Sequence, residues 1–165
     1  MTLEVSTRDP VGAQVRGVAV GPLNPAVVSQ LRALLAVHGV LVLPDQHVDD
    51  DAFVQFLKSF GTLVFTTGET PVPAAPQLNV ITNVGRTCTP RSSFHVDTSY
   101  LRNPPAYTAL RAVTVPERGG QTLFTNQYTA YATLPRQLQA QIRNRVVTHA
   151  VTGLCLLYTS DAADE

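Results

Sequence analysis

The sequence predicts a mainly β fold with flanking helices, of the jelly-roll type of β-sandwich. Many of the apolar runs are short, rich in β-branched residues and bounded by glycine and proline, as strands are. Only a few segments show apolar residues at helical spacing. The chain has 165 residues, of which 44% are hydrophobic, and this is enough apolar material for one packed domain.

The first helix is predicted over residues 25–38, after two short strands at residues 3–5 and 12–20. Asn24 can cap this helix, and Pro25 suits its first turn because the N–H that proline lacks would have no intrahelical partner there. Gly39 ends the helix. Apolar residues recur at intervals of three and four on one face, which we expect to be buried: Val27, Val28, Leu31, Leu34 and Leu35.

A buried strand and a second helix are predicted next. Residues 40–43 are continuously apolar, as expected of a strand that is buried on both faces. Three acidic residues, Asp49 to Asp51, favour the positive end of a helix dipole, and Gly61 ends the apolar pattern that follows them. The apolar positions of this helix are Phe53, Phe56, Leu57 and Phe60.

The rest of the chain alternates between loops and predicted strands. Residues 66–76 contain too many prolines for a strand ladder and are expected to form a loop, and the irregular residues 85–93 could form a lid beside a site. Residues 127–144 are predicted to form a helix in two pieces, broken at Pro135. Further strands are predicted at residues 78–84, 107–115, 121–125 and 146–151, with a turn at residues 116–120.

Composition argues against several partners. The 12 Lys and Arg residues balance the 12 Asp and Glu residues, and no basic run contains interleaved aromatics, so we expect no nucleic-acid partner. The N-terminus has no signal-peptide pattern and no apolar run approaches the roughly 20 residues of a membrane helix, so we expect a cytoplasmic protein without a membrane partner. Cys88 and Cys155 have no metal-binding or disulfide-framework spacing, so nitrogen and oxygen ligands would have to hold any metal.

His95 and Asp97 are the candidate metal ligands. They lie two residues apart in a segment that otherwise reads as a strand, where residues i and i+2 point to the same face. An imidazole nitrogen and a carboxylate oxygen could thus clamp one cation. A third ligand would complete the two-His, one-carboxylate face of non-haem Fe(II) oxygenases, which leaves three positions open. From spacing alone, the alternative is a histidine that is hydrogen-bonded to a nearby aspartate.

The residues around this pair resemble the taurine dioxygenase-like (TauD/TfdA) family of Fe(II)/2-oxoglutarate-dependent oxygenases. Residues 94–124, FHVDTSYLRNPPAYTALRAVTVPERGGQTLF, contain the family's aromatic-H-x-D segment, then P-P-A, then G-G-x-T-L-[FW]. Further matching stretches are GAQVRGV, HGVLVLPDQ, FLKSFGTL and ITNVG before this segment and AYATLP after it. The resemblance therefore covers nearly all of residues 3–151.

The resemblance implies an incomplete double-stranded β-helix and an enzyme that uses Fe(II), 2-oxoglutarate and O2 to hydroxylate a small organic substrate, releasing succinate. His95 and Asp97 match the first two iron ligands, and the resemblance implies no catalytic residue beyond the metal ligands. Thr122, in GGQTLF, matches the residue that binds a carboxylate of 2-oxoglutarate. Phe94 would wall the iron site and help exclude water. Related halogenases lack the carboxylate of Asp97, so its presence favours hydroxylation.

The substrate pocket departs from the pattern of family members that act on taurine. Where these have a His and a Tyr, this chain has Thr66 and Glu69, and Arg91 replaces an Asn. Arg91, with Arg86 and Arg102, could bind an anionic substrate. The alternative is that these arginines are solvated loop charges. We expect the full-length protein to turn over taurine inefficiently.

The family's second His ligand and its 2-oxoglutarate-binding Arg lie further downstream than this chain extends. His38, His47 and His149 match positions that are not iron ligands in the family. We therefore expect residues 1–154 to be the N-terminal portion of a TauD/TfdA-like dioxygenase domain. We expect the 165-residue chain itself to be inactive and to have strand edges that no neighbouring strand covers. Residues 155–165, CLLYTSDAADE, match the translation of a transposon-end sequencing adaptor and are expected to be a non-native tail. A native terminal strand with an acidic tail is the alternative.

Two other function classes are compatible with the sequence. One is a non-catalytic jelly-roll protein that binds a small molecule, and the other is a metal-dependent isomerase or hydrolase on the same fold. The joint presence of His95, Asp97 and Thr122 argues against the first, and dependence on 2-oxoglutarate would discriminate the second. The full-length protein could also form a homo-oligomer.

Overall fold

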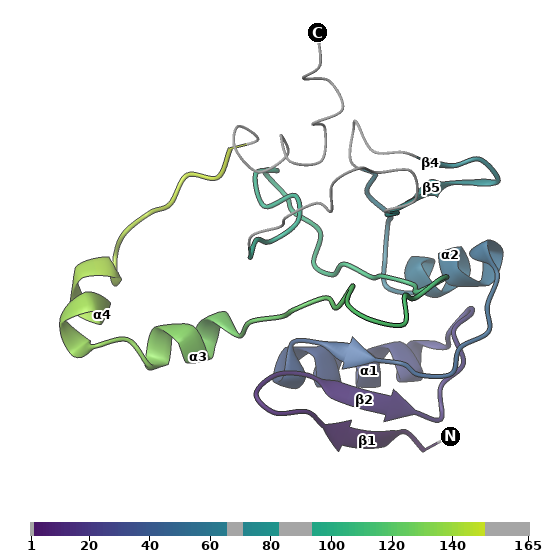
Figure 1. The fold of residues 1–165 in the computed structure, drawn as a ribbon, viewed down its shortest axis with the longest axis horizontal. Helices are drawn as coiled ribbons and strands as arrows, with labels where there is room; N and C mark the ends of the chain where they lie inside the picture. Colours follow the sequence, from purple (N-terminus) through teal and green to yellow (C-terminus); the bar gives the residue numbers. More distant parts are fainter. Residues whose placement is uncertain (1, 66–70, 83–93, 151–165) are drawn as a thin grey trace, which may run out of the picture.

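The computed structural model describes residues 2–65, 71–82 and 94–150. Within these ranges all buried hydrophobic side chains lie between Ala13 and Leu78, and no residue from 94 to 150 is buried. Figure 1 shows the N-terminal elements gathered together, while the chain from residue 94 onward follows a long path to two helices that lie apart from them. Every helix in the described ranges is too short or too polar to cross a bilayer.

Three strands form the N-terminal sheet in the order β1-β2-β3. Strand β1 (Glu4–Thr7) is antiparallel to β2 (Ala13–Arg16), and β2 is parallel to the two-residue strand β3 (Leu41–Val42). A parallel pair needs a crossover connection, and helix α1 (Pro25–His38) provides it. The predicted order of these elements is confirmed. The predicted full burial of residues 40–43 is wrong, because Val42 is half-exposed on a strand that pairs with β2 alone in the described sheet.

Helix α1 begins and ends where its sequence signals predict. The Asn24 side chain accepts a hydrogen bond from the Val27 backbone N–H at 3.0 Å, and the Gly39 N–H donates to the Leu35 carbonyl at 2.8 Å. Gly39 has φ = 74°, a left-handed conformation that glycine adopts readily. The buried face of the helix packs on the sheet. The main core cluster contains residues of the helix, of the sheet and of the segments that follow them: Val15, Val18, Val27, Leu31 and Phe56.

Helix α2 (Asp50–Lys58) has the predicted acidic start. Asp49 caps it by accepting a hydrogen bond from the Ala52 N–H at 2.8 Å. Phe56 faces the main core, whereas Val54 packs in a second small cluster with Ala75 and Leu78. Helix α2 therefore joins the N-terminal sheet layer to the segment that follows it.

Residues 71–79 form a hairpin that the sequence analysis did not predict. Strand β4 (Pro71–Val72) pairs antiparallel with β5 (Ala75–Asn79). The prediction of a loop over residues 66–76 is therefore wrong for its described part, residues 71–76. A two-stranded hairpin has a free edge on each strand, and proline is tolerated there because it does not interrupt a ladder. The strand predicted at residues 78–84 starts earlier and ends at Asn79, while residues 83 and 84 lie outside the described residues.

Residues 94–150 contain two helices and no strand. Helices α3 (Gln127–Ala132) and α4 (Arg136–Ile142) confirm the predicted two-piece helix broken at Pro135. The strands predicted at residues 107–115 and 121–125, and at the described residues 146–150, do not form. Backbone groups in a strand need a partner strand, and no described residue pairs with these segments. The described fold therefore combines small sheets with helices, and it does not contain the two packed sheets of a jelly roll.

Arg111 attaches this second part of the chain to α2. Its guanidinium donates to the Val48 carbonyl at 2.8 Å and forms an ion pair with Asp50, the first residue of α2. The same group lies 5.6 Å from the centre of the Phe53 ring, within the range of a cation–π contact. The Arg111 and Asp50 side chains are 22% and 32% exposed, so the ion pair is partly shielded from water.

Candidate metal centre

His95 and Asp97 converge in the structure. Nε2 of His95 and Oδ1 of Asp97 are 2.9 Å apart, and the two side chains are 33% and 50% exposed. This distance fits a hydrogen bond between the two side chains. It also fits two neighbouring ligands, because two metal bonds of about 2.1 Å at a right angle place their donor atoms about 3.0 Å apart. An imidazole nitrogen and a carboxylate oxygen are suitable donors for Fe(II), so this half of the implied iron site fits the residues present.

The pair converges in a turn and not in the predicted strand. Residues 97–100 form the turn, in which the Ser99 N–H donates to the Val96 carbonyl at 3.4 Å and the Leu101 N–H to the Thr98 carbonyl at 3.0 Å. Thr98 has φ = 51°, which is rare for a β-branched residue. Its hydroxyl oxygen is buried and has no hydrogen-bond partner in the described structure. The conformation just after Asp97 is thus a strained one that neighbouring groups must hold.

His149 contacts this turn, which the sequence analysis did not anticipate. Its Nδ1 lies 2.7 Å from the hydroxyl oxygen of Ser99, 50 residues earlier in the chain. The prediction that His149 is not an iron ligand stays a prediction. A pair so distant in sequence leaves no periodic or spacing signal, so sequence reasoning had no means of finding it.

A third metal ligand is not found within the described residues. In this part of the chain, no three His, Cys, Asp or Glu side chains gather into a group that could hold a metal ion. His38 ends α1, as predicted, and His47 is exposed before α2.

Thr122 is exposed and lies in neither a helix nor a strand. It follows Gly119 and Gly120, which have φ = 77° and 70° and confirm the predicted turn at residues 116–120. A Cβ at Gly120 would meet Pro116 at 2.9 Å, so the turn is too tight for a side chain there. The role of Thr122 toward 2-oxoglutarate stays a prediction, since no described contact tests it.

The other expected site residues are exposed or lie outside the described residues. Phe94 is exposed, and its expected role as a wall of the iron site stays a prediction. Arg102 is also exposed. The remaining predicted positions lie outside the described residues: Thr66, Glu69, Arg86, Arg91 and the expected lid at residues 85–93.

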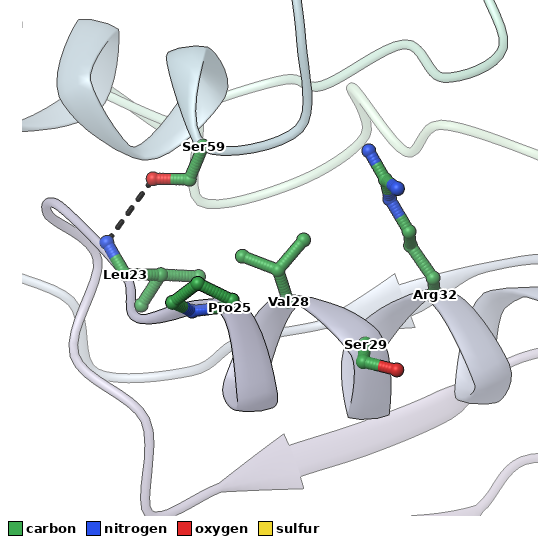
Figure 2. A pocket seen from close by; sticks show the side chains of 6 residues that line it. All are labelled: Leu23, Pro25, Val28, Ser29, Arg32 and Ser59. Atoms are coloured by element: carbon green, nitrogen blue, oxygen red, sulfur yellow. Dashed lines mark hydrogen bonds between the residues drawn. The ribbon is translucent and has the colours of Figure 1, made fainter.

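A shallow pocket lies elsewhere, between the start of α1 and the end of α2. Its volume is about 290 Å³, and Figure 2 shows its lining residues, Leu23, Pro25, Val28, Ser29, Arg32 and Ser59. Two of the polar groups already have partners: the Ser59 hydroxyl accepts from the Leu23 N–H at 3.1 Å, and Arg32 donates to the Phe60 carbonyl at 2.6 Å. The pocket contains no predicted site residue, and its lining side chains do not combine an acid, a nucleophile and a base. We therefore assign no chemistry to this pocket.

Comparison with known proteins matches most of this chain to one protein family. A family model described as "Taurine catabolism dioxygenase TauD, TfdA family" matches residues 4–153. The chain is 31% identical over 132 residues to an alpha-ketoglutarate-dependent sulfate ester dioxygenase of Pseudomonas putida, covering 78% of this chain and 43% of that protein. It is 27% identical over 168 residues to an (S)-phenoxypropionate/alpha-ketoglutarate-dioxygenase of Delftia acidovorans, covering 91% and 55%. The chain thus spans about half the length of the curated relatives it matches.

A solved structure shows the same similarity. The crystal structure of a taurine dioxygenase from Burkholderia xenovorans matches with a TM-score of 0.66 and 28% sequence identity. The match covers 86% of this chain and 52% of that one. The described arrangement is therefore similar to about half of a complete structure of this kind.

Proposed function

The chain belongs to the TauD/TfdA family, as its motifs predict, and from this premise we propose that the full-length protein is an Fe(II)- and 2-oxoglutarate-dependent dioxygenase. It would hydroxylate a small organic substrate with O2 while 2-oxoglutarate loses CO2 and becomes succinate. The observation that carries the proposal is the 2.9 Å approach of His95 Nε2 and Asp97 Oδ1 within the family's H-x-D motif. Relatives named for alpha-ketoglutarate, which is 2-oxoglutarate, support the choice of cosubstrate.

His95 and Asp97 would hold the metal, and Thr122 would donate its hydroxyl to a carboxylate of 2-oxoglutarate. Bound iron and 2-oxoglutarate supply the oxidising chemistry, while the protein supplies binding and orientation. For His95 to bind through Nε2, its ring proton must reside on Nδ1, and Asp97 must be ionised. The hydrogen bond between the two side chains would then be replaced by their shared contact with the ion.

We further propose that residues 1–154 are the N-terminal portion of a double-stranded β-helix domain and that residues 155–165 are a non-native tail. The unpaired apolar runs at residues 107–115 and 121–125 support the first part, because β-branched segments of this kind are stable when partner strands cover them. The family match over residues 4–153 supports the second. Sequencing the locus from independently prepared genomic DNA tests both, and a stop codon directly after Glu165 would contradict them.

The substrate is proposed to be a small organic anion that Arg91 helps to bind. Relatives named for sulfate esters and phenoxypropionate support this, since both carry an anionic group at neutral pH. The replacement of the family's taurine-pocket residues by Thr66, Glu69 and Arg91 supports a substrate other than taurine. Succinate release with taurine as fast as with the best anion tested would refute this choice.

The test is succinate formation by the purified full-length protein, measured with Fe(II), 2-oxoglutarate and a panel of sulfate esters and aryloxy acids. Activity should require both Fe(II) and 2-oxoglutarate, and His95→Ala and Asp97→Ala should each lower it about 100-fold or more, beyond the usual cost of altering groups that only support the ligands. His47→Ala, at an exposed histidine, is the control and should leave activity unchanged.

The other outcomes identify the rival functions. Metal binding without any substrate-dependent succinate would favour a non-catalytic binding protein, and turnover that is independent of 2-oxoglutarate would favour an isomerase or hydrolase. The 165-residue chain itself should form no succinate. The cytoplasmic location, the absence of a nucleic-acid or membrane partner and the formation of a homo-oligomer stay predictions.

A further inference from the structure

We propose that His149 is a positioning residue for the metal-binding pair, and that it acts through Ser99. The inference rests on the proposed function, because it concerns how the same pair is held. Its basis is the juxtaposition of a long-range hydrogen bond with a strained turn directly after Asp97.

The turn depends on a backbone conformation that the chain does not favour by itself. The hydrogen bond from the Ser99 N–H to the Val96 carbonyl spans Asp97 and Thr98, and it closes while Thr98 keeps φ = 51°. A threonine relaxes from this region unless its surroundings hold it, and its buried hydroxyl has no hydrogen-bond partner in the described structure that would compensate. The 3.4 Å backbone bond is long and therefore weak. The Leu101 N–H also donates to the Thr98 carbonyl at 3.0 Å, but this bond does not span Asp97. The part of the turn that carries Asp97 therefore depends on the weak bond and on contacts from outside the turn.

The His149 side chain provides such a contact from outside the turn. Its Nδ1 is 2.7 Å from the Ser99 hydroxyl oxygen, a short distance for a hydrogen bond. The neighbouring Val146 and Val147 are both exposed, so the approach of His149 does not follow from burial of the segment that carries it. The imidazole thus fixes Ser99, which lies two residues from the carboxylate of Asp97.

The expected consequence is an effect on metal affinity without the loss of a metal ligand. Without the bond to Ser99, the turn would open in part of the population, and in those molecules the carboxylate of Asp97 would no longer face Nε2 of His95. The fraction competent to bind metal sets the apparent affinity. Removing one hydrogen bond of this kind should weaken Fe(II) binding by about threefold to tenfold, and the upper value applies when the open turn predominates.

The experiment measures Fe(II) affinity of the full-length protein without O2, by competition with a chelator. His149→Phe and Ser99→Ala should each raise Kd by about threefold to tenfold, and the double variant should be no weaker than either single variant. Ser99→Thr, which keeps the hydroxyl, should retain most of the affinity. His47→Phe is the matched control at an exposed histidine and should stay within about twofold of wild type. The melting temperature of each metal-free protein is measured in parallel.

Each contrary result has a distinct meaning. Wild type that binds no Fe(II), or binds it equally well after His95→Ala, would overturn the proposed function itself. Dependence on His95 with no effect of His149→Phe or Ser99→Ala would overturn the positioning role alone. Additive losses of Fe(II) affinity in the double variant, accompanied by lower melting temperatures, would also overturn the positioning role. A loss of Fe(II) affinity with His149→Phe as large as that with His95→Ala would overturn it as well, because His149 would then be a ligand. If His149→Phe does not fold, Ser99→Ala and Ser99→Thr decide the matter.

Discussion

Replacing Arg111 by methionine should lower the free energy of unfolding by about 2 kcal/mol. The guanidinium hydrogen bond to the Val48 carbonyl, at 2.8 Å, contributes about 1 kcal/mol. The ion pair with Asp50 contributes about another 1 kcal/mol or less, because both side chains are 22–32% exposed and solvent screens part of their attraction. The contact with the Phe53 ring adds about 0.5 kcal/mol. Methionine keeps most of the apolar stem, so the loss reports these polar interactions.

The assay is urea unfolding of the full-length protein, followed by far-ultraviolet circular dichroism. Arg118→Met, at an exposed arginine, is the control and should change stability by less than about 0.5 kcal/mol. A double-mutant cycle with Asp50→Asn isolates the ion pair, because the interaction of Asp50 with the α2 dipole is lost in both backgrounds and cancels. A coupling energy near zero, or an Arg111→Met variant as stable as the control, would refute the reasoning.

Two further predictions concern the N-terminal core and are measured by the same unfolding assay. Leu31→Ala should lower the free energy of unfolding by about 3 kcal/mol, because Leu31 is 1% exposed in the main core cluster. Val37→Ala, at a residue that is 75% exposed on the same helix, should lower it by less than about 0.5 kcal/mol. Equal effects would mean that the core is not formed. Gly17→Ala should destabilise by more than about 1 kcal/mol, because Gly17 has φ = 81° and an added Cβ would lie 2.8 Å from the Thr2 carbonyl oxygen. Gly21→Ala, with nothing within 4 Å of its added Cβ, should be neutral or slightly stabilising, and a larger loss there than at Gly17 would contradict the described backbone.

Elements with local signals were predictable from the sequence. Asn24 and Gly39 bound α1, acidic residues lie at the start of α2, and Pro135 separates α3 from α4, all as expected. Each of these signals acts on backbone groups within about four residues, so the information lies beside the structure that it determines. The burial of one α1 face was likewise readable from the three-and-four spacing of its apolar residues.

Strands and long-range contacts were less predictable, because their determinants are distant. Residues 107–115 have the composition of a strand, yet a strand also requires a partner, and none of the described segments provides one. The hairpin at residues 71–79 shows the opposite case, in which pairing occurs despite three prolines in residues 71–76. Arg111 meets Asp50 across 61 residues and His149 meets Ser99 across 50, and no local pattern encodes either contact.

The pair of His95 and Asp97 shows why the H-x-D spacing alone was a weak signal. The spacing predicts convergence because alternate side chains of a strand share a face, yet His95 and Asp97 converge across the start of a turn. A turn and a strand can therefore both place the two donor atoms about 3 Å apart, so the spacing constrains the side chains and leaves the backbone undetermined. The specific information came instead from P-P-A and G-G-x-T-L-F following H-x-D in order. These segments form no strand pair in the described chain, so local pairing does not account for their order, which agrees with the match to the TauD/TfdA family.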